Sequence, residues 1–333
     1  MRSQVEATTG VCTDLGHLAA QVNAGRQLLG AAAHTEGACL VSSGTPVLEG
    51  RVDLTNGRRY ASIGRAYAGQ TADYQVCGCH VHVGVPDRET AVAVVNHLRP
   101  WLPTLLALSV NSPFDRGRDS GYASWRILEQ ARFPGAGVPP WFDSAAACNA
   151  EVERLVVCGT LMDHATSFWH ARPSPRWPTV EVRAADALGC VWETMLQAAL
   201  VRALVRTALA DLGTGREACR PSDQVAAAAV WSAARYGLSG AAVHPVLERR
   251  VPTRRLVAEM IDRIAPALEE SGDLRMVRTA LARLRARGTG AVRQRRAAAG
   301  GLAAVVDMLV AQTSQPDEAH AEVQTGPVRR TMK

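Results

Sequence analysis

The feature that most constrains this fold is Cys77–Gly84, which reads Cys-Gly-Cys-His-Val-His-Val-Gly. Successive side chains of an extended strand point to opposite faces, so His80 and His82 share one face. Cys79, Val81 and Val83 share the other face. This alternation predicts a strand with an apolar rear. Two alternatives are consistent with this alternation. The strand is either half-buried with two surface histidines, or it presents a functional face.

A second stretch, Thr179–Arg183, has the same design, with Thr179, Glu181 and Arg183 on one face and valines behind. Two such strands predict a sheet with helices behind it and an open polar site in front. Glu181 is a candidate metal ligand, with a salt-bridge role as the alternative. Arg183 is placed to clamp a phosphate or carboxylate, or to pair with Glu181. A further short strand carrying Glu6 is expected at Gln4–Thr8.

Helical periodicity dominates the chain after Leu188. The expected helices there cover Val191–Leu212, Val225–Tyr236, Arg254–Leu268, Leu274–Arg287 and Gly301–Gln312. The expected strands are too far apart for regular βαβ units, so the pattern favours an α+β fold. The polar residues around Arg58 predict a loop. Asn111–Arg126, which is long and polar, predicts a functional loop.

Composition excludes several classes of protein. The net charge is +6 with a single lysine, Lys333, and no dense basic run alternates with aromatic residues, so no nucleic-acid partner is expected. No apolar run reaches the roughly 18 residues of a membrane span, so no membrane partner is expected. Eight cysteines are scattered through 333 residues without a signal peptide. A reducing, cytoplasmic location is therefore favoured over a disulfide framework.

The chemistry of the two strands suits a divalent metal that holds an anionic substrate such as a nucleotide phosphate. Histidine is an uncommon magnesium ligand, which counts against assigning both imidazoles to one ion. The sequence has no Walker P-loop, no G-x-G-x-x-G after a strand, no H-E-x-x-H and no G-x-S-x-G. A bound nucleotide would therefore be held by a less common arrangement.

Several motifs occur in an order that resembles the carboxylate–amine ligase family, the type 2 glutamate–cysteine ligases. They are Cys77–Gly84, Asn111-Ser-Pro-Phe114, Asp119–Arg126, Arg172-Pro-Ser174, Pro178–Arg183 and Ala291–Arg295. The resemblance implies a glutamine-synthetase-like, mainly antiparallel sheet with helices packed behind it and a largely helical C-terminal half. It also implies one catalytic domain over residues 1–313. Residues 314–333 contain few apolar side chains, which predicts a disordered tail.

The resemblance further implies an ATP-dependent ligase that joins glutamate to cysteine through an acyl phosphate, with Mg²⁺ bridging ATP and the carboxylate. The expected partners are amino acids and ATP, with a homodimer as an open assembly state. Carried over position by position, the metal ligands are Glu6, His80 and Glu181. Arg183 corresponds to an arginine that contacts the transferred phosphate, and Arg126 to one that holds glutamate. His82 has no firm counterpart: it either touches substrate or orients His80.

The chain also departs from the family pattern. Family members carry an earlier strand with a pair of metal-binding glutamates, whose place would precede Met1. His170 stands where the family has an acid after tryptophan. Two alternatives therefore stay open: an ATP-dependent ligase, expected to be weak in this shortened form, and a non-catalytic homologue that binds nucleotide or a partner without turnover.

Overall fold

The computed structural model of the protein describes residues 3–50 and 54–315. Its central sheet has three strands in the order β1-β7-β6, and both pairings are antiparallel. These strands are β1 (Gly78–Gly84), β6 (Ala171–Pro173) and β7 (Thr179–Asp186). The predictions of strands at Cys77–Gly84 and at Thr179–Arg183 are therefore confirmed, and the two strands are direct neighbours.

The remaining strands are short and form separate pairs. They are β2 (Phe114–Asp115) with β3 (Arg118–Asp119), β4 (Ala136–Gly137) with β5 (Phe168–Trp169), and β8 (Ala241–His244) with β9 (Arg249–Pro252). The first and third pairs are antiparallel, and β4 pairs with β5 in parallel. The β8–β9 hairpin interrupts the second half of the chain, which the sequence predicted to be almost wholly helical.

Helices make up most of the structure. Those before the sheet is complete are α1 (Leu15–Thr35), α2 (Arg58–Tyr67), α3 (Arg88–Leu98), α4 (Leu102–Ser109), α5 (Trp125–Ala131) and α6 (Ala145–Val157). Those after it are α7 (Val191–Gly213), α8 (Asp223–Tyr236), α9 (Thr253–Glu270), α10 (Leu274–Arg287), α11 (Gly290–Ala297) and α12 (Leu302–Ser314). Two short 3₁₀ turns cover Ala68–Thr71 and Ala298–Gly300. This confirms the prediction of an α+β fold with a largely helical second half.

The apolar rear of the sheet forms the main core. Val180 and Val182 of β7 are 0% and 3% exposed, and they pack in one cluster with residues of α3, α4 and α7. Each fully buried valine or leucine contributes about 1.5–3 kcal/mol, so this cluster fixes which face of the sheet points outward. The polar side chains between the valines are left on the opposite face.

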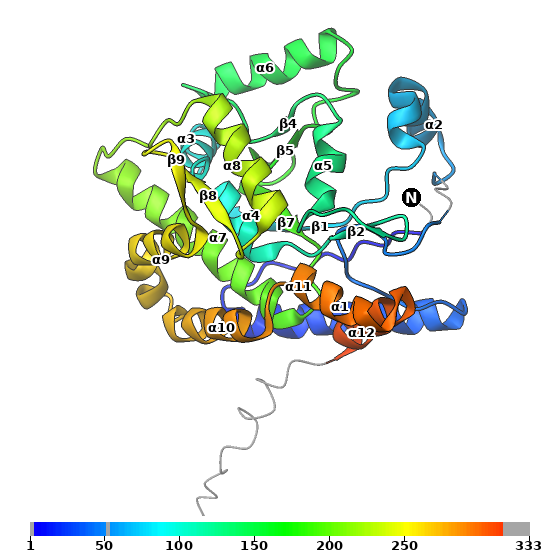
Figure 1. The fold of residues 1–333 in the computed structure, drawn as a ribbon. Coiled ribbons are helices and arrows are strands. Elements are labelled where there is room, and N and C mark those ends of the chain that lie inside the picture. The colour runs from blue at the N-terminus through cyan, green and yellow to red at the C-terminus, as the bar shows by residue number, and fades with distance from the viewer. Residues whose placement is uncertain (1–2, 51–53, 316–333) are drawn as a thin grey trace, which may run out of the picture.

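A lower layer of helices lies beneath α7 in Figure 1. It consists of α1, α10, α11 and α12, and α1, from the start of the chain, contacts α12 from its end. Asp14 caps α1 by accepting a hydrogen bond from the His17 backbone N–H. In the part of the chain that the structure describes, no helix is both long and apolar enough to cross a bilayer. All eight cysteines are free thiols.

Two local predictions were wrong. Gln4–Thr8 forms no strand, because none of the described residues pairs with its backbone and alternation over five residues cannot supply a partner. The segment after Arg58, predicted as a loop, is the helix α2. Its polar residues face solvent, while Tyr67 is buried edge-on against Phe133 with ring centroids 5.2 Å apart. The predicted tail lies outside the described residues from position 316 onward.

Candidate active site

Strand register brings the polar side chains into one row across the sheet. His82 of β1 lies opposite Glu181 of β7, and Arg172 of β6 lies opposite the same glutamate from the other side. A β-bulge between Cys79 and Val81 shifts the register of β1 next to His80. We call the group Glu181, Arg172, Arg183, His80 and His82 the sheet site.

Glu181 is the centre of this site. Arg172 Nε donates to Glu181 Oε2 at 2.7 Å, and Arg183 pairs with Glu181 Oε1. Burial alone would raise the pKa of Glu181, but the two guanidinium groups outweigh it and lower the pKa to about 2. The carboxylate is therefore charged at any working pH. The alternative of a surface ion pair is excluded, because the side chains of Glu181 and Arg183 are only 6% and 16% exposed.

The two histidines lie beside this carboxylate. His80 Nδ1 is 3.4 Å and His82 Nε2 is 3.9 Å from Glu181 Oε1. Burial and the nearby Arg183 charge lower the pKa of His80 to about 3, so its ring is neutral and keeps a lone pair. His82 lies at the rim, and its Nδ1 is 2.9 Å from Thr179 Oγ1. Burial also lowers the pKa of His82.

Arg183 has unused hydrogen-bonding capacity. Among the described residues, nothing accepts a hydrogen bond from its buried Nε. The neighbouring His170 is 2% exposed, and its Nδ1 also has no partner in the described chain. Burial, with further contributions from the Arg126 and Arg183 charges, lowers the pKa of His170 to about 3. A buried arginine with a free donor favours an incoming anion.

Arg126 lies under the site rather than at its surface. The residue is 1% exposed, and its guanidinium donates to the carbonyl oxygens of Arg183 and Ala184 at 2.8 and 3.2 Å. Its Nη1 also lies 3.5 Å from Asp186 Oδ1. In this arrangement Arg126 holds the backbone of β7, and its buried Nε has no acceptor among the described residues.

Glu6 lies at the margin of the site. It is exposed on the unpaired segment that precedes α1, yet its charge is close enough to raise the pKa of His82 against the larger effect of burial. Within residues 3–50 and 54–315, no group of three or more histidine, cysteine, aspartate or glutamate residues is arranged to hold a metal ion. The structure thus brings His80 and Glu181 together but does not join Glu6 to them in a three-ligand set.

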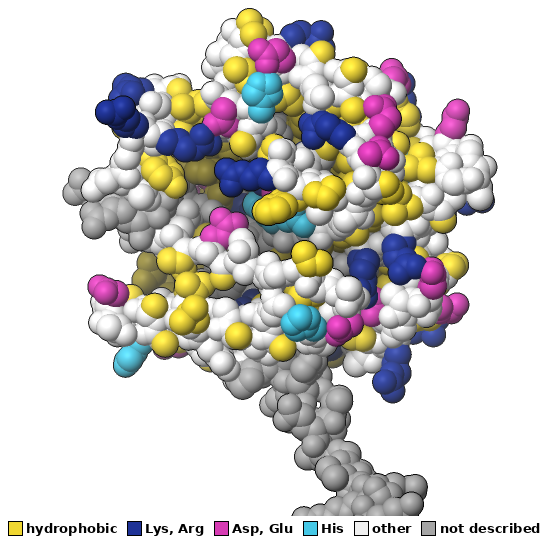
Figure 2. Space-filling view, turned by 180° about the vertical axis from the view of Figure 1, so that it is seen from behind, with side chains coloured by type: hydrophobic (Ala, Val, Ile, Leu, Met, Phe, Trp, Pro, Cys, Tyr) yellow, Lys and Arg dark blue, Asp and Glu magenta, His cyan; other side chains and the backbone are white. Residues whose placement is uncertain are grey.

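Viewed from behind, the molecule is hollowed near its centre, and Figure 2 shows arginine and histidine side chains meeting at the hollow. The hollow lies over the region that β1 and β7 occupy in Figure 1. Basic groups at a concave surface with one buried carboxylate are typical of a site for a small anionic ligand.

Comparison with known proteins agrees with the motif order. Residues 1–333 match the family model described as "Glutamate-cysteine ligase family 2 (GCS2)". This chain belongs to glutamate–cysteine ligase family 2. A protein of Saccharopolyspora erythraea named "Putative glutamate--cysteine ligase 2-2" is 59% identical over 317 residues, which are 94% of this chain and 81% of that protein. A relative in Salinispora arenicola is 45% identical over 315 residues, 93% of this chain and 83% of that protein.

A solved structure shares the fold of this chain at much lower sequence identity. The Pup ligase PafA of the prokaryotic ubiquitin-like modification pathway, in complex with ADP, is 15% identical with a TM-score of 0.50. The alignment covers 94% of this chain and 66% of that one. The fold is thus shared with a ligase, and the glutamine-synthetase-like form of the sheet stays a prediction.

Two residues at or beside the sheet site, Arg172 and His170, have no role that the sequence predicts. Arg172 belongs to one of the quoted motifs, but its pairing with Glu181 depends on the antiparallel register of β6, which three residues of strand do not reveal. In the sequence, His170 stands out only as a departure from the family pattern. Its burial beside Arg183 follows from the same register, since the Arg183 backbone N–H donates to the His170 carbonyl at 2.7 Å.

Proposed function

We propose that this protein is an ATP-dependent carboxylate–amine ligase that joins glutamate to cysteine through an acyl phosphate. The observation that carries the proposal is the sheet site, in which one charged carboxylate, two arginines and two histidines lie together on one face of the sheet. The family supplies the reaction class, and the names of the curated relatives supply glutamate and cysteine.

The arginines suit phosphoryl transfer. Negative charge on the transferred group and on both attacking and leaving oxygens must be stabilised by fixed positive groups. Arg183 is pre-oriented by Glu181 and has a free Nε donor, so it can bind a phosphate or carboxylate oxygen without losing its present partner. Arg172 is also fixed, because its Nη1 donates to the carbonyl oxygens of Ala165 and Ser167 at 2.8 and 3.2 Å. The ADP-bound Pup ligase supports a nucleotide as the phosphoryl donor.

Magnesium fits this site only in combination with the nucleotide. Mg²⁺ is usually held by one or two protein carboxylates together with substrate phosphates. Glu181 would supply such an oxygen, and the neutral His80 ring adjoins it. When bound, the ion would neutralise phosphoryl charge. Glu6 as a third ligand, Arg126 and His82 as contacts for glutamate, the cytoplasmic location and the homodimer all stay predictions.

The test is a ligase assay on the purified full chain with ATP, Mg²⁺, glutamate and cysteine. Release of phosphate that depends on both amino acids, together with γ-glutamylcysteine detected by mass spectrometry, is the expected result. Glu181→Ala should abolish both signals. Cys79→Ser is the matched control, because Cys79 lies on β1 but faces the apolar rear of the sheet. Equal activity in Glu181→Ala and the unmodified chain would contradict the proposal.

A second candidate function is nucleotide binding without turnover. The pairing of two arginines with the single carboxylate Glu181 favours it, because this arrangement suits an anionic ligand whether or not a reaction follows. Isothermal titration with ATP and Mg²⁺ separates the two candidates. Binding that is lost in Glu181→Ala, without phosphate release for any amino-acid pair, would support the non-catalytic homologue.

A further inference from the structure

A second arginine-rich cavity lies away from the sheet site, at the start of α7. Its volume is about 410 Å³, within the range of small-molecule pockets. It is enclosed by α7, α10, α11 and α12, and it shares no residue with the sheet site. We call it the arginine pocket, and its principal lining residues are Trp192, Arg283, Arg287, Arg293, Met308 and Gln312.

The charged side chains that line the arginine pocket are all arginines. Three arginines and no acidic residue are among the described residues that line the cavity. The nearby Glu193 does not balance them, because both of its oxygens are taken by Arg293 Nη2 at 2.9 and 2.8 Å. Glu193 also accepts the backbone N–H of Cys190 at 3.1 Å, which caps α7. Glu193 is therefore engaged by Arg293, and the positive charge of Arg287 remains available to a ligand.

Hydrogen-bond donors in the pocket outnumber acceptors. Within residues 3–50 and 54–315, no group accepts a hydrogen bond or ion pair from the Arg287 guanidinium. Trp192 is 6% exposed, and no described atom accepts a hydrogen bond from its buried Nε1. The amide of Gln312 points its Nε2 at the weak acceptor Met308 Sδ, while its Oε1 already accepts from Arg293 Nε at 3.3 Å.

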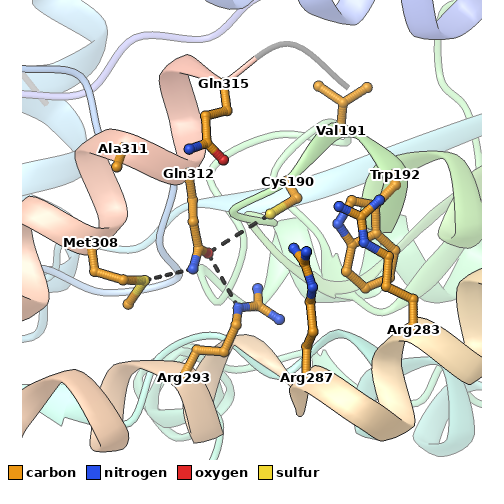
Figure 3. Close-up of a pocket in the computed structure, with 10 residues that line it drawn as sticks. All are labelled: Cys190, Val191, Trp192, Arg283, Arg287, Arg293, Met308, Ala311, Gln312 and Gln315. Atoms are coloured by element: carbon orange, nitrogen blue, oxygen red, sulfur yellow. Dashed lines mark hydrogen bonds between the residues drawn. The ribbon is translucent and has the colours of Figure 1, made fainter. Parts of the chain in front are cut away.

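The donors also converge on one place. Figure 3 shows Arg287 rising from α10 into the middle of the cavity, between Arg293 and Trp192. Arg283, one turn earlier on α10, stacks over the Trp192 ring with its Cζ 4.9 Å from the centroid. A buried indole N–H without an acceptor costs free energy, and a ligand oxygen would relieve that cost.

We propose that the arginine pocket binds a small multivalent oxyanion, carrying two or more carboxylate or phosphate groups. Arg287 and Trp192 Nε1 would donate to the ligand, and Arg293, held by Glu193, would form the fixed wall of the pocket. This binding is independent of ATP and of the ligase reaction at the sheet site.

The experiment is isothermal titration of the full chain, without ATP or magnesium, using inorganic pyrophosphate in one arm and citrate in the other. Arg287→Gln should weaken binding about tenfold, as expected for the loss of a charge-assisted hydrogen bond. Arg285→Gln is the matched control: it removes the same charge from the same last turn of α10 without lining the pocket. Both arginines are exposed, so neither change should impair folding.

A second variant, Trp192→Phe, keeps the ring beneath Arg283 and removes only the N–H. It should weaken binding severalfold, and its folding is checked by circular dichroism. Tighter binding of pyrophosphate would assign the pocket to phosphate ligands, and tighter binding of citrate to carboxylates, provided that either depends on Arg287. Absence of binding in both arms, or equal loss in Arg285→Gln and Arg287→Gln, would overturn the proposal.

Discussion

Arginine side chains have opposite roles in the sheet site and in the arginine pocket. At the sheet site, Arg172 and Arg183 share one carboxylate, Glu181, and all three side chains are largely buried. In the arginine pocket, Glu193 is occupied by Arg293, and the exposed Arg287 has no acidic partner in the described part of the chain. In the first region both arginines are held by one buried carboxylate, and in the second an exposed arginine has no acidic partner among the described residues.

The difference between the two regions is that the sheet site pre-organises its arginines, whereas the arginine pocket attracts anions. A buried ion-pair network holds arginines in a fixed geometry at a desolvation cost, and removal of one partner leaves uncompensated charge. An unbalanced pocket attracts anions but leaves its exposed arginine mobile and screened by salt. Fixed geometry suits a reacting group, whereas attraction suits a ligand that is only bound.

The largest expected effect follows from Glu181→Gln. The change keeps the side chain's shape but removes the charge that holds Arg172 and Arg183 together. Loss of one partner from a buried ion pair costs about 3–5 kcal/mol, so urea unfolding should show destabilisation of this size. Ligase activity should fall by at least about 100-fold, because the arginines lose their positions.

The matched control for this prediction is Glu151→Gln on α6. Glu151 pairs with Arg154 at a solvent-exposed position, with side chains 30% and 70% exposed, and such pairs contribute only about 0–1 kcal/mol. Similar unfolding midpoints for Glu181→Gln and Glu151→Gln would show that the sheet network is not a stabilising element.

The next effect in size concerns Arg293→Gln. Arg293 is 10% exposed, binds both oxygens of Glu193 and donates to the Gly288 carbonyl at 2.7 Å. Its loss leaves Glu193 buried without its partner, so we expect about 3 kcal/mol of destabilisation in urea unfolding. Ligase activity per folded molecule should be unchanged, because Arg293 lies outside the sheet site. Arg285→Gln, on α10, should leave stability within about 0.5 kcal/mol of the unmodified chain.

The polar face of the sheet was largely predictable from sequence because strand alternation alone fixes it. The patterns in Cys77–Gly84 and Thr179–Arg183 place His80, His82, Glu181 and Arg183 on polar faces, and the sheet brings these faces together. The long helices were predictable for the same reason, since a period of 3.6 residues repeats many times in each.

The remaining features depend on contacts that no local pattern encodes. Arg172 reaches Glu181 only through the pairing of the three-residue strand β6. Gln4–Thr8 has a strand-like alternation but no partner, and α2 is polar enough to resemble a loop. The arginine pocket joins residues of four helices over more than 100 positions, so it emerges only when those helices pack.

A smaller effect is expected from pH through His170. Burial and the charges of Arg126 and Arg183 lower its pKa in the folded chain to about 3, whereas the unfolded pKa is about 6.5. The unfolded state therefore binds a proton first as the pH falls. Stability is fully present above about pH 6.5 and is lost progressively towards pH 3.

Urea unfolding between about pH 7 and pH 5 measures this loss, because most carboxylates remain ionised over that range. The His170→Gln variant should lose less stability across this interval than the unmodified chain. His164→Gln is the control, since the His164 side chain is 60% exposed. An identical pH slope in all three proteins would show that His170 does not stay neutral in the fold.

The smallest effect, and the most direct comparison of the two regions, is that of salt. The Debye length falls from about 10 Å at 0.1 M to about 3 Å at 1 M, and buried pairs are screened much less than exposed charges. Pyrophosphate binding, which relies on the exposed Arg287, should weaken severalfold over this range. The difference in unfolding free energy between Glu181→Gln and the unmodified chain should stay nearly constant, because the side chains of Glu181 and Arg172 are only 6% and 11% exposed. Titration calorimetry and urea unfolding at both salt concentrations measure the two responses. If salt reduced the Glu181 effect as strongly as pyrophosphate binding, the sheet network would be solvent-screened, and the distinction between fixed and attracting arginines would fail.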